Sequence, residues 1–244
     1  MNFLQKSKKI IAVATLLSGL ALFAGCGGQK AEEAISGTVS ASGSTALLPL
    51  LKPAQEEFHK KHEKVTGNIA GGGSFTGMNQ VAAGAVQIGN SDVNLPADFK
   101  DKGLVDHKVV VLPFVFIANK DVNVNNLSAE QYVNILTGKI TNWKEVGGKD
   151  QKITIIHRAK SSGSRATITE TVLKGANFTD NAIIQDSNGA VKTAIASTPG
   201  AIGYVDAPYA DDTIKILDFN GGKYAADAVI NGTYPVYSYG QMYT

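Results

Sequence analysis

Cysteine is nearly absent from this sequence. The 244 residues contain one cysteine, Cys26, so no disulfide bond can form within the chain. The sequence also has no cluster of basic residues that would indicate nucleic-acid binding, and no long run of like charges that would indicate a disordered tail. The formal charge of +2 includes three lysines within residues 1–25, where no acid stands, so the rest of the chain carries −1.

Two signatures of hydrolytic enzymes are also missing. The sequence has no Gly-x-Ser-x-Gly segment, in which a serine nucleophile stands on a sharp turn. The stretch from His59 to Glu63 lacks the His-Glu-x-x-His order of a zinc-binding helix, and its lysines are typical of a solvated helix end. We therefore predict no catalytic residue, no metal site and no cofactor.

Apolar residues are plentiful. They make up 43% of the 244 residues, whereas charged residues make up 18%. A chain of this length can bury the core of one large domain or of two lobes. We find no internal repeat.

Residues 1–25 have the features of a bacterial signal peptide. A basic segment, Met1 to Lys9, precedes an apolar stretch, Ile10 to Ala24, which is short for a membrane span. The end of this stretch and the two residues after it, Leu22-Phe23-Ala24-Gly25-Cys26, resemble a lipobox, with phenylalanine at a position where leucine is usual. We expect Cys26 to become the lipidated N-terminus, and residues 26–34 to form a short tether.

Strands and helices alternate along most of the remaining chain, with apolar residues spaced for each type of element. This order predicts an α/β fold with mostly parallel sheets that are covered by helices on both faces. The longest apolar run, Lys108 to Ala118, is expected to be a central strand interrupted at Pro113. Pro49 and Pro53 are expected to make the first turns of an early helix irregular, and 214–219 and 234–243 are expected to be two final strands.

Four connections from a strand to the next helix are rich in serine, threonine and glycine. They lie at Ser44, Ser74, Ser162 and Ser187, and Arg158 ends the strand before the third of them. Helix N-termini present free N–H groups and a positive dipole end, and ligands of α/β sheets bind at the carboxyl ends of strands. The pattern favours a site for a tetrahedral oxyanion. Taken singly, each loop is equally typical of an ordinary helix cap.

A family resemblance is carried by segments that occur in a fixed order. They are Ser42-Gly43-Ser44-Thr45-Ala46, Gly72-Gly73-Ser74, Ile88-Gly89-Asn90-Ser91-Asp92, Ile140-Thr141-Asn142-Trp143, Arg158 with Ser162-Gly163-Ser164, and Ser187-Asn188-Gly189-Ala190 followed by Pro199-Gly200-Ala201-Ile202-Gly203-Tyr204. From about Ile35 to the last residue, the chain resembles the PstS-type phosphate-binding lipoproteins of bacterial phosphate ABC transporters. The resemblance implies a two-lobed periplasmic-binding-protein-like fold of class II, with mixed, mostly parallel sheets and the ligand in the cleft between the lobes.

The same resemblance implies how the chain is divided between the lobes. Lobe 1 would comprise residues 35–117 and 234–244, and lobe 2 residues 118–233. The lobes would hinge near 115–119 and 234–237 and close on the anion. Family members continue past the equivalent of Tyr234 to Gly240 with a helix-rich segment, so we expect this chain to be a fragment or a short form with an apolar patch on lobe 1.

The family's phosphate contacts can be placed on this sequence residue by residue. Ser44, Thr45, Ala46 and Ser74 would donate from lobe 1, Arg158 would give a charged contact from lobe 2, and Ser162, Gly163 and Ser164 would supply donors at a helix start. Ser164 stands where the family usually has threonine, and Lys160 where many members have an acidic or small residue. We expect Lys160 to point to solvent. Arg165 is equally well interpreted as a second charge at the site or as an exposed helix residue.

Asp92 matches the acidic ligand of the family, and its chemistry explains selectivity. Phosphate keeps a proton near neutral pH, whereas sulfate does not. An ionised Asp92 would accept a hydrogen bond from that proton and would repel a fully deprotonated anion. The alternative is that Asp92 only caps the loop that follows it.

The predicted partners follow from this assignment. They are inorganic phosphate, an ABC permease with its ATPase, and membrane lipid through Cys26. The protein would be a monomer on the extracytoplasmic face of the cell membrane.

Three alternatives remain: an enzyme such as a phosphatase, a binding protein for another oxyanion such as sulfate or molybdate, and a phosphate sensor or surface protein on the same fold. A phosphatase would need a metal or a nucleophile beside the anion, and the sequence suggests neither.

Overall fold

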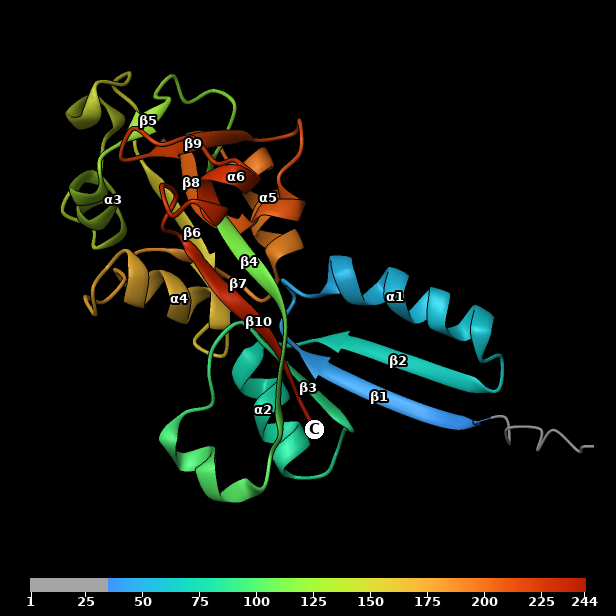
Figure 1. Cartoon of the computed structure of the whole chain (residues 1–244). Coiled ribbons are helices and arrows are strands. Elements are labelled where there is room, and N and C mark those ends of the chain that lie inside the picture. The colour runs from blue at the N-terminus through green and yellow to red at the C-terminus, as the bar shows by residue number, and fades with distance from the viewer. Residues whose placement is uncertain (1–34) are drawn as a thin grey trace, which may run out of the picture. The chain divides into compact units, whose positions relative to one another are not determined.

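The computed structural model describes residues 35–244. The predicted signal peptide, Cys26 and the tether lie outside this range. The described residues form a mixed α/β structure around a ten-stranded sheet with the order β2-β1-β3-β10-β4-β8-β6-β7, while β9 pairs with β4 and β5. Figure 1 shows β4 and β10 running side by side along the middle of this sheet.

The first section of the sheet is built from the strands nearest the N-terminus. β1 (Gly37–Gly43) pairs in parallel with β2 (Val65–Gly71) and β3 (Ile88–Ser91). Successive side chains of a strand point to opposite faces. Ser42 bonds to Gln80 of α2 (Ser74–Ala82), whereas Ala41 faces α1 (Leu48–Lys61). The two helices therefore cover opposite faces, and a 3-10 helix (Ala97–Lys102) follows β3.

β4 (Asp106–Ala118) belongs to both sections of the sheet. Its residues up to Pro113 pair with β10 (Tyr237–Tyr243), and its residues from Phe114 pair with β8 (Ala201–Asp206). The interruption predicted at Pro113 is wrong, because the strand is continuous there. The proline stands where the strand changes its partner, a position at which a missing N–H is tolerated.

The second section of the sheet contains β8 together with β6 (Thr154–Arg158), β7 (Ile183–Gln185) and β9 (Lys215–Phe219). The short strand β5 (Asn126–Leu127) pairs with β9. Its helices are α3 (Ala129–Leu136), α4 (Gly163–Thr171), α5 (Asn188–Ser197) and α6 (Ala226–Ile230), with 3-10 helices at Trp143–Val146 and Ala207–Tyr209. α3 begins with a capping box of Ser128 and Gln131. Its buried face packs on the main core, where Tyr132 stacks on Phe116 with ring centroids 3.9 Å apart.

Two predictions need correction. α1 is continuous despite its two prolines: Pro49 stands in the first turn, where N–H groups need no helical partner, and Pro53 is accommodated inside the helix. The two expected final strands are present as β9 and β10, which α6 separates in the chain and which join different sections of the sheet. The sheet is also less parallel than predicted, since β10 is antiparallel to β3 and β4, and β4 to β8 and β9.

An apolar hollow of about 360 Å³ lies between α1 and the first section of the sheet. Leu51 and Phe58 line it from the helix, and Val39, Ile69 and Met242 from the strands. Phe58 and Val39 are exposed there, so this surface carries apolar side chains. Within residues 35–244, no helix is both long and apolar enough to span a membrane.

Candidate anion-binding site

The structure brings the predicted site residues together at strand ends and helix starts. Ser44, Thr45 and Ala46 lie between β1 and α1, Ser74 begins α2, Asp92 follows β3, Arg158 ends β6, and Ser162, Gly163 and Ser164 begin α4. All nine residues are buried. Strand order explains this clustering, because the carboxyl ends of β1, β3 and β6 face the site.

Asp92 stands at the centre of the cluster. Its Oδ1 accepts a hydrogen bond from the Ser44 hydroxyl, and its Oδ2 accepts one from the Ser164 hydroxyl at 2.8 Å. Its backbone N–H donates to the Ser74 hydroxyl at 2.9 Å. Asp92 is therefore held by residues from both sections of the sheet, and the interpretation of it as only a loop cap does not account for these contacts.

Burial raises the pKa of the Asp92 carboxyl above its ordinary value, because a desolvated carboxylate is costly. The hydrogen bonds from Ser44 and Ser164 and the charge of Arg158 lower the pKa and oppose this effect. The surroundings of Asp92 thus supply the donors and the positive charge that an ionised carboxylate needs.

Arg158 is buried to 2% exposure, which is rare for arginine. Its Nη2 donates to the carbonyl of Asp186 at 2.8 Å, and its Nε has no hydrogen-bond partner among residues 35–244. Burial lowers the pKa of the guanidinium, and the nearby Asp92 opposes this shift. A buried guanidinium with an unpaired N–H can donate to an anion.

The hydroxyl groups of the cluster are prepared to donate hydrogen bonds. Ser44 Oγ accepts from the Ala46 N–H at 3.0 Å, Ser162 Oγ accepts from the Arg165 N–H at 3.2 Å, and Ser74 Oγ accepts from Asp92 as described. A hydroxyl that accepts from an N–H keeps its own proton for another acceptor. In Ser44 that proton already goes to Asp92, so the hydroxyls of Ser74 and Ser162, together with the helix N-termini, are the donors that this arrangement offers to a bound anion.

Two glycines allow the sections to approach closely at the site. A Cβ atom on Gly163 would collide with Ser74 Oγ and lie 2.9 Å from the Cβ of Asp92. A Cβ atom on Gly73 would lie 2.5 Å from the carbonyl oxygen of Ser161, and Gly73 has a φ of +94°. The Phe75 N–H donates to that same carbonyl at 3.1 Å. The starts of α2 and α4 are therefore in direct contact.

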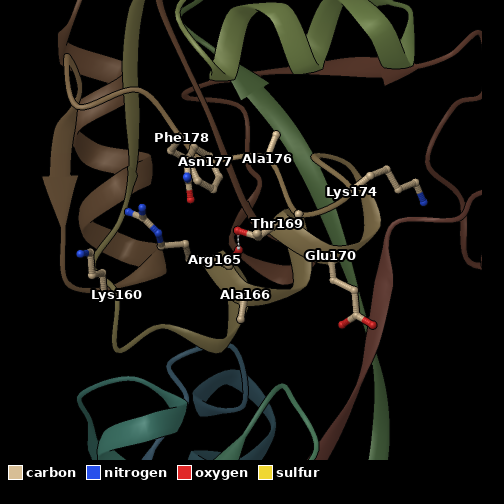
Figure 2. A pocket seen from close by; sticks show the side chains of 10 residues that line it. Lys160, Arg165, Ala166, Thr169, Glu170, Lys174, Ala176, Asn177 and Phe178 are labelled. Carbon is tan, nitrogen blue, oxygen red and sulfur yellow. Dashed lines mark hydrogen bonds between the residues drawn. The ribbon is translucent and has the colours of Figure 1, made fainter.

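The two basic residues near this loop lie on the outer side of α4. Lys160 is exposed, as predicted. Arg165 is half-buried: its guanidinium lies over the Phe178 ring at 4.9 Å, and its Nη1 donates to the carbonyl of Arg158 at 2.9 Å. Figure 2 shows both side chains on one side of a hollow of about 690 Å³, with Lys174 on the other side. Arg165 thus braces the end of β6 from outside, which neither interpretation had described.

The predicted site set omits three residues beside the cluster, of which Asn188 and Asp206 are buried. Asn188 contacts Thr45, and the Tyr209 hydroxyl donates to the Thr45 carbonyl at 2.6 Å. Asp206 is fully buried, and neither of its carboxyl oxygens has a hydrogen-bond partner among the described residues. The Ser187-Asn188-Gly189 segment is a recognisable helix start, but its contact with Thr45 has no local sequence signal.

Comparisons with known proteins identify the family. The model of the PBP superfamily domain matches residues 28–244. The phosphate-binding protein PstS of Bacillus subtilis is 41% identical over 256 aligned residues, covering 98% of this chain and 84% of the relative. PstS of Borreliella burgdorferi is 30% identical, covering 93% and 80%.

Solved structures agree with this result. A substrate-binding protein from Clostridium perfringens, solved with bound phosphate, has a TM-score of 0.81 and 31% identity, covering 85% of this chain and 86% of that one. An ABC-type phosphate transport receptor from Vibrio cholerae has a TM-score of 0.68 and 25% identity, covering 84% and 86%. These likenesses confirm the predicted α/β binding-protein fold and the prediction that the protein is not an enzyme. The chain belongs to the PBP superfamily and, within it, to the family of PstS phosphate-binding proteins.

Proposed function

We propose that this chain binds inorganic phosphate outside the cytoplasm and delivers it to an ABC permease for import. The observation that carries the proposal is the buried cluster itself, in which hydroxyl groups, helix N-termini and one guanidinium surround a single carboxylate. An excess of donors with one acceptor suits an anion that carries one proton.

The role of each proposed contact follows from its position. Thr45, Ala46 and Ser74 donate from the first section, where Ser44 holds Asp92. Ser162 and Gly163 donate from the start of α4, where Ser164 holds Asp92, and Arg158 supplies the positive charge. Asp92 accepts the remaining proton of phosphate. A sulfate ion has no such proton, so the desolvated carboxylate of Asp92 would face an anion without a hydrogen bond between them. The free energy of sulfate binding would therefore be unfavourable, because an unpaired buried charge is costly.

Phosphate delivery also needs the site to open. We propose two lobes, residues 35–117 with 234–244 and residues 118–233, that hinge where the chain crosses between them, near 115–119 and 234–237. The change of partner at Pro113 and Phe114 lies close to this boundary. Closure would remove water from the anion and strengthen its contacts with both lobes.

We also propose the membrane attachment that the N-terminal sequence predicts. Removal of residues 1–25 would leave Cys26 to carry lipid, with residues 26–34 as a tether to the folded part. Metabolic labelling with a palmitate analogue would detect this modification, and labelling that survives replacement of Cys26 by alanine would contradict it.

Calorimetric titration of the purified chain with phosphate, and separately with sulfate, tests the function at neutral pH. We expect tight phosphate binding and no sulfate binding. Equal binding of both anions would favour the alternative of a general oxyanion-binding protein and would remove the role given to Asp92. A folded sample that binds neither anion would overturn the proposed function.

A further inference from the structure

Asn188, the first residue of α5, reaches from the second section of the sheet to Thr45 in the first. It is completely buried. Its Nδ2 donates to Thr45 Oγ1 at 3.1 Å, and its backbone N–H donates to the same oxygen at 3.3 Å. Its Oδ1 accepts from the backbone N–H of Asp206 at 3.0 Å. The first two of these contacts join Asn188 to a residue of the candidate site, Thr45.

The contact with Asp206 fixes the orientation of this amide. A backbone N–H can only donate, so the oxygen of Asn188 must face Asp206 and its NH₂ group must face Thr45. The opposite orientation would place two donors against each other at the Asp206 side. Asn188 is therefore a donor to Thr45 and cannot be an acceptor.

This arrangement leaves the Thr45 hydroxyl one possible role. A hydroxyl has two acceptor lone pairs and one donor proton. Asn188 fills both acceptor positions of Thr45 Oγ1, and no acceptor for the hydroxyl proton is present among residues 35–244. Thr45 can therefore only donate its remaining hydrogen bond.

We propose that Asn188 is a positioning residue that holds the Thr45 hydroxyl as an obligatory donor to an unprotonated oxygen of phosphate. The inference rests on the proposed phosphate site and extends it. Asp92 accepts from the oxygen that carries the proton, and Thr45 donates to another oxygen, which is the better acceptor when it is unprotonated and more negative. The Asn188–Thr45 pair and Asp92 together determine which phosphate oxygen is protonated.

The test is a double-mutant cycle for phosphate affinity, measured by calorimetry on the full chain. Thr45→Val removes the hydroxyl, and Asn188→Ala removes the Nδ2 donor. We expect each to weaken binding roughly tenfold, as loss of one hydrogen bond does, and we expect the double variant to bind about as well as Thr45→Val alone. Asn142→Ala is the matched control, because Asn142 organises a turn outside the site; it should leave affinity unchanged.

Asn188→Asp gives a second readout with a side chain of nearly the same shape, and it serves if Asn188→Ala does not fold. The new carboxylate would accept from Thr45 and turn its hydroxyl away from the anion. We expect Asn188→Asp to lower phosphate affinity roughly a hundredfold. In a protein that already carries Thr45→Val, the same substitution should lower affinity less, because no hydroxyl is left to be turned away. The loss that remains in the double variant should be due only to repulsion between the added carboxylate and phosphate.

The outcomes separate the two proposals. Wild-type protein that fails to bind phosphate overturns the proposed function, and this inference with it. Wild-type protein that binds, while the effects of Asn188 and Thr45 simply multiply, overturns the inference alone, because Asn188 would then act through structure and not through the hydroxyl. Full affinity in Asn188→Ala would also overturn it.

Discussion

The hydroxyl of Ser164 donates to Oδ2 of Asp92 at 2.8 Å, which joins the start of α4 to the loop after β3. The other carboxylate oxygen is held by Ser44. The aspartate is thus fixed by one hydroxyl from each section of the sheet. A carboxylate held in this way keeps its remaining lone pairs in defined directions, where a ligand proton can meet them.

Replacing Asp92 by asparagine tests this role. The amide keeps the shape but can offer an N–H to an anion, so we expect phosphate affinity to fall about tenfold to a hundredfold and sulfate binding to rise. Competitive titration of both anions gives the ratio of affinities. An unchanged preference for phosphate would sink the assignment of Asp92 as the proton acceptor.

Arg158→Lys should abolish most of the binding. Lysine has no planar group that can bond to the Asp186 carbonyl and still present an N–H to the anion. We expect phosphate affinity to fall more than about a hundredfold, since a charge-assisted contact is lost and its neighbours stay buried. Lys160→Ala, two residues along the chain and exposed, is the control and should bind normally. A comparable loss of phosphate affinity in both variants would contradict a specific contact of Arg158 and would indicate that only the overall positive charge matters.

Gly163→Ala should prevent close approach of the sections. The added methyl group would collide with Ser74 Oγ, so we expect weak phosphate binding and no ligand-induced compaction in small-angle scattering. Gly189→Ala adds the same methyl group near the start of α5, where the closest atom is 3.9 Å away on Tyr209. This control should bind and compact normally, and compaction of Gly163→Ala to the same extent would contradict the prediction.

Tyr209→Phe should make phosphate dissociate faster. Its hydroxyl donates to the Thr45 carbonyl at 2.6 Å, and burial first, with the charge of Asp206 second, raises its pKa to about 12, so it stays a donor at alkaline pH. Losing this contact should raise the dissociation rate about fivefold to tenfold and leave association nearly unchanged. Stopped-flow measurements separate the two rates. Tyr132→Phe, which loses a 3.0 Å bond to the Asp218 carbonyl, is the matched control.

Asp206→Asn should stabilise the protein most at alkaline pH. Burial, and after it the charge of Asp92, raises the pKa of Asp206 to about 8, whereas an unfolded aspartate ionises near pH ~4. Between these values the folded protein keeps a proton that the unfolded chain releases, so the contribution of this group to stability falls as pH rises, by about 1.4 kcal/mol per unit.

The measurement is the melting temperature of both proteins between pH 4 and 9. We expect the difference in favour of Asp206→Asn to grow from about pH 4 to pH 8 and then to level off. A difference that does not vary with pH would mean that Asp206 ionises normally in the folded protein.

The gathering of the site could be predicted from the sequence because its members carry local signals. Ser74, Arg158 and Ser162 each stand at a strand end or a helix start, and such positions meet at one edge of an α/β sheet. The order of the motifs then gave Asp92 a place among them. No such signal exists for Asn188, whose contact with Thr45 joins residues 143 positions apart.

The same limit applies to the fold. Element types follow from hydrophobic periodicity, but the partner of a strand depends on contacts far along the chain. Pro113 therefore indicated a break in β4, although the strand only changes its partner there. Asp206 was missed for this reason too, since its burial depends on pairing between β8 and Phe114.

The place of β10 has a consequence for how the protein matures. This strand lies between β3 and β4, although the whole second section precedes it in the chain. A nascent chain that lacks residues 237–243 exposes two unpaired strand edges, which are templates for aggregation. The pairing that joins β3 to β4 through β10 therefore forms only after a late segment of the polypeptide has been made, and until then both edges are open to pairing with other chains.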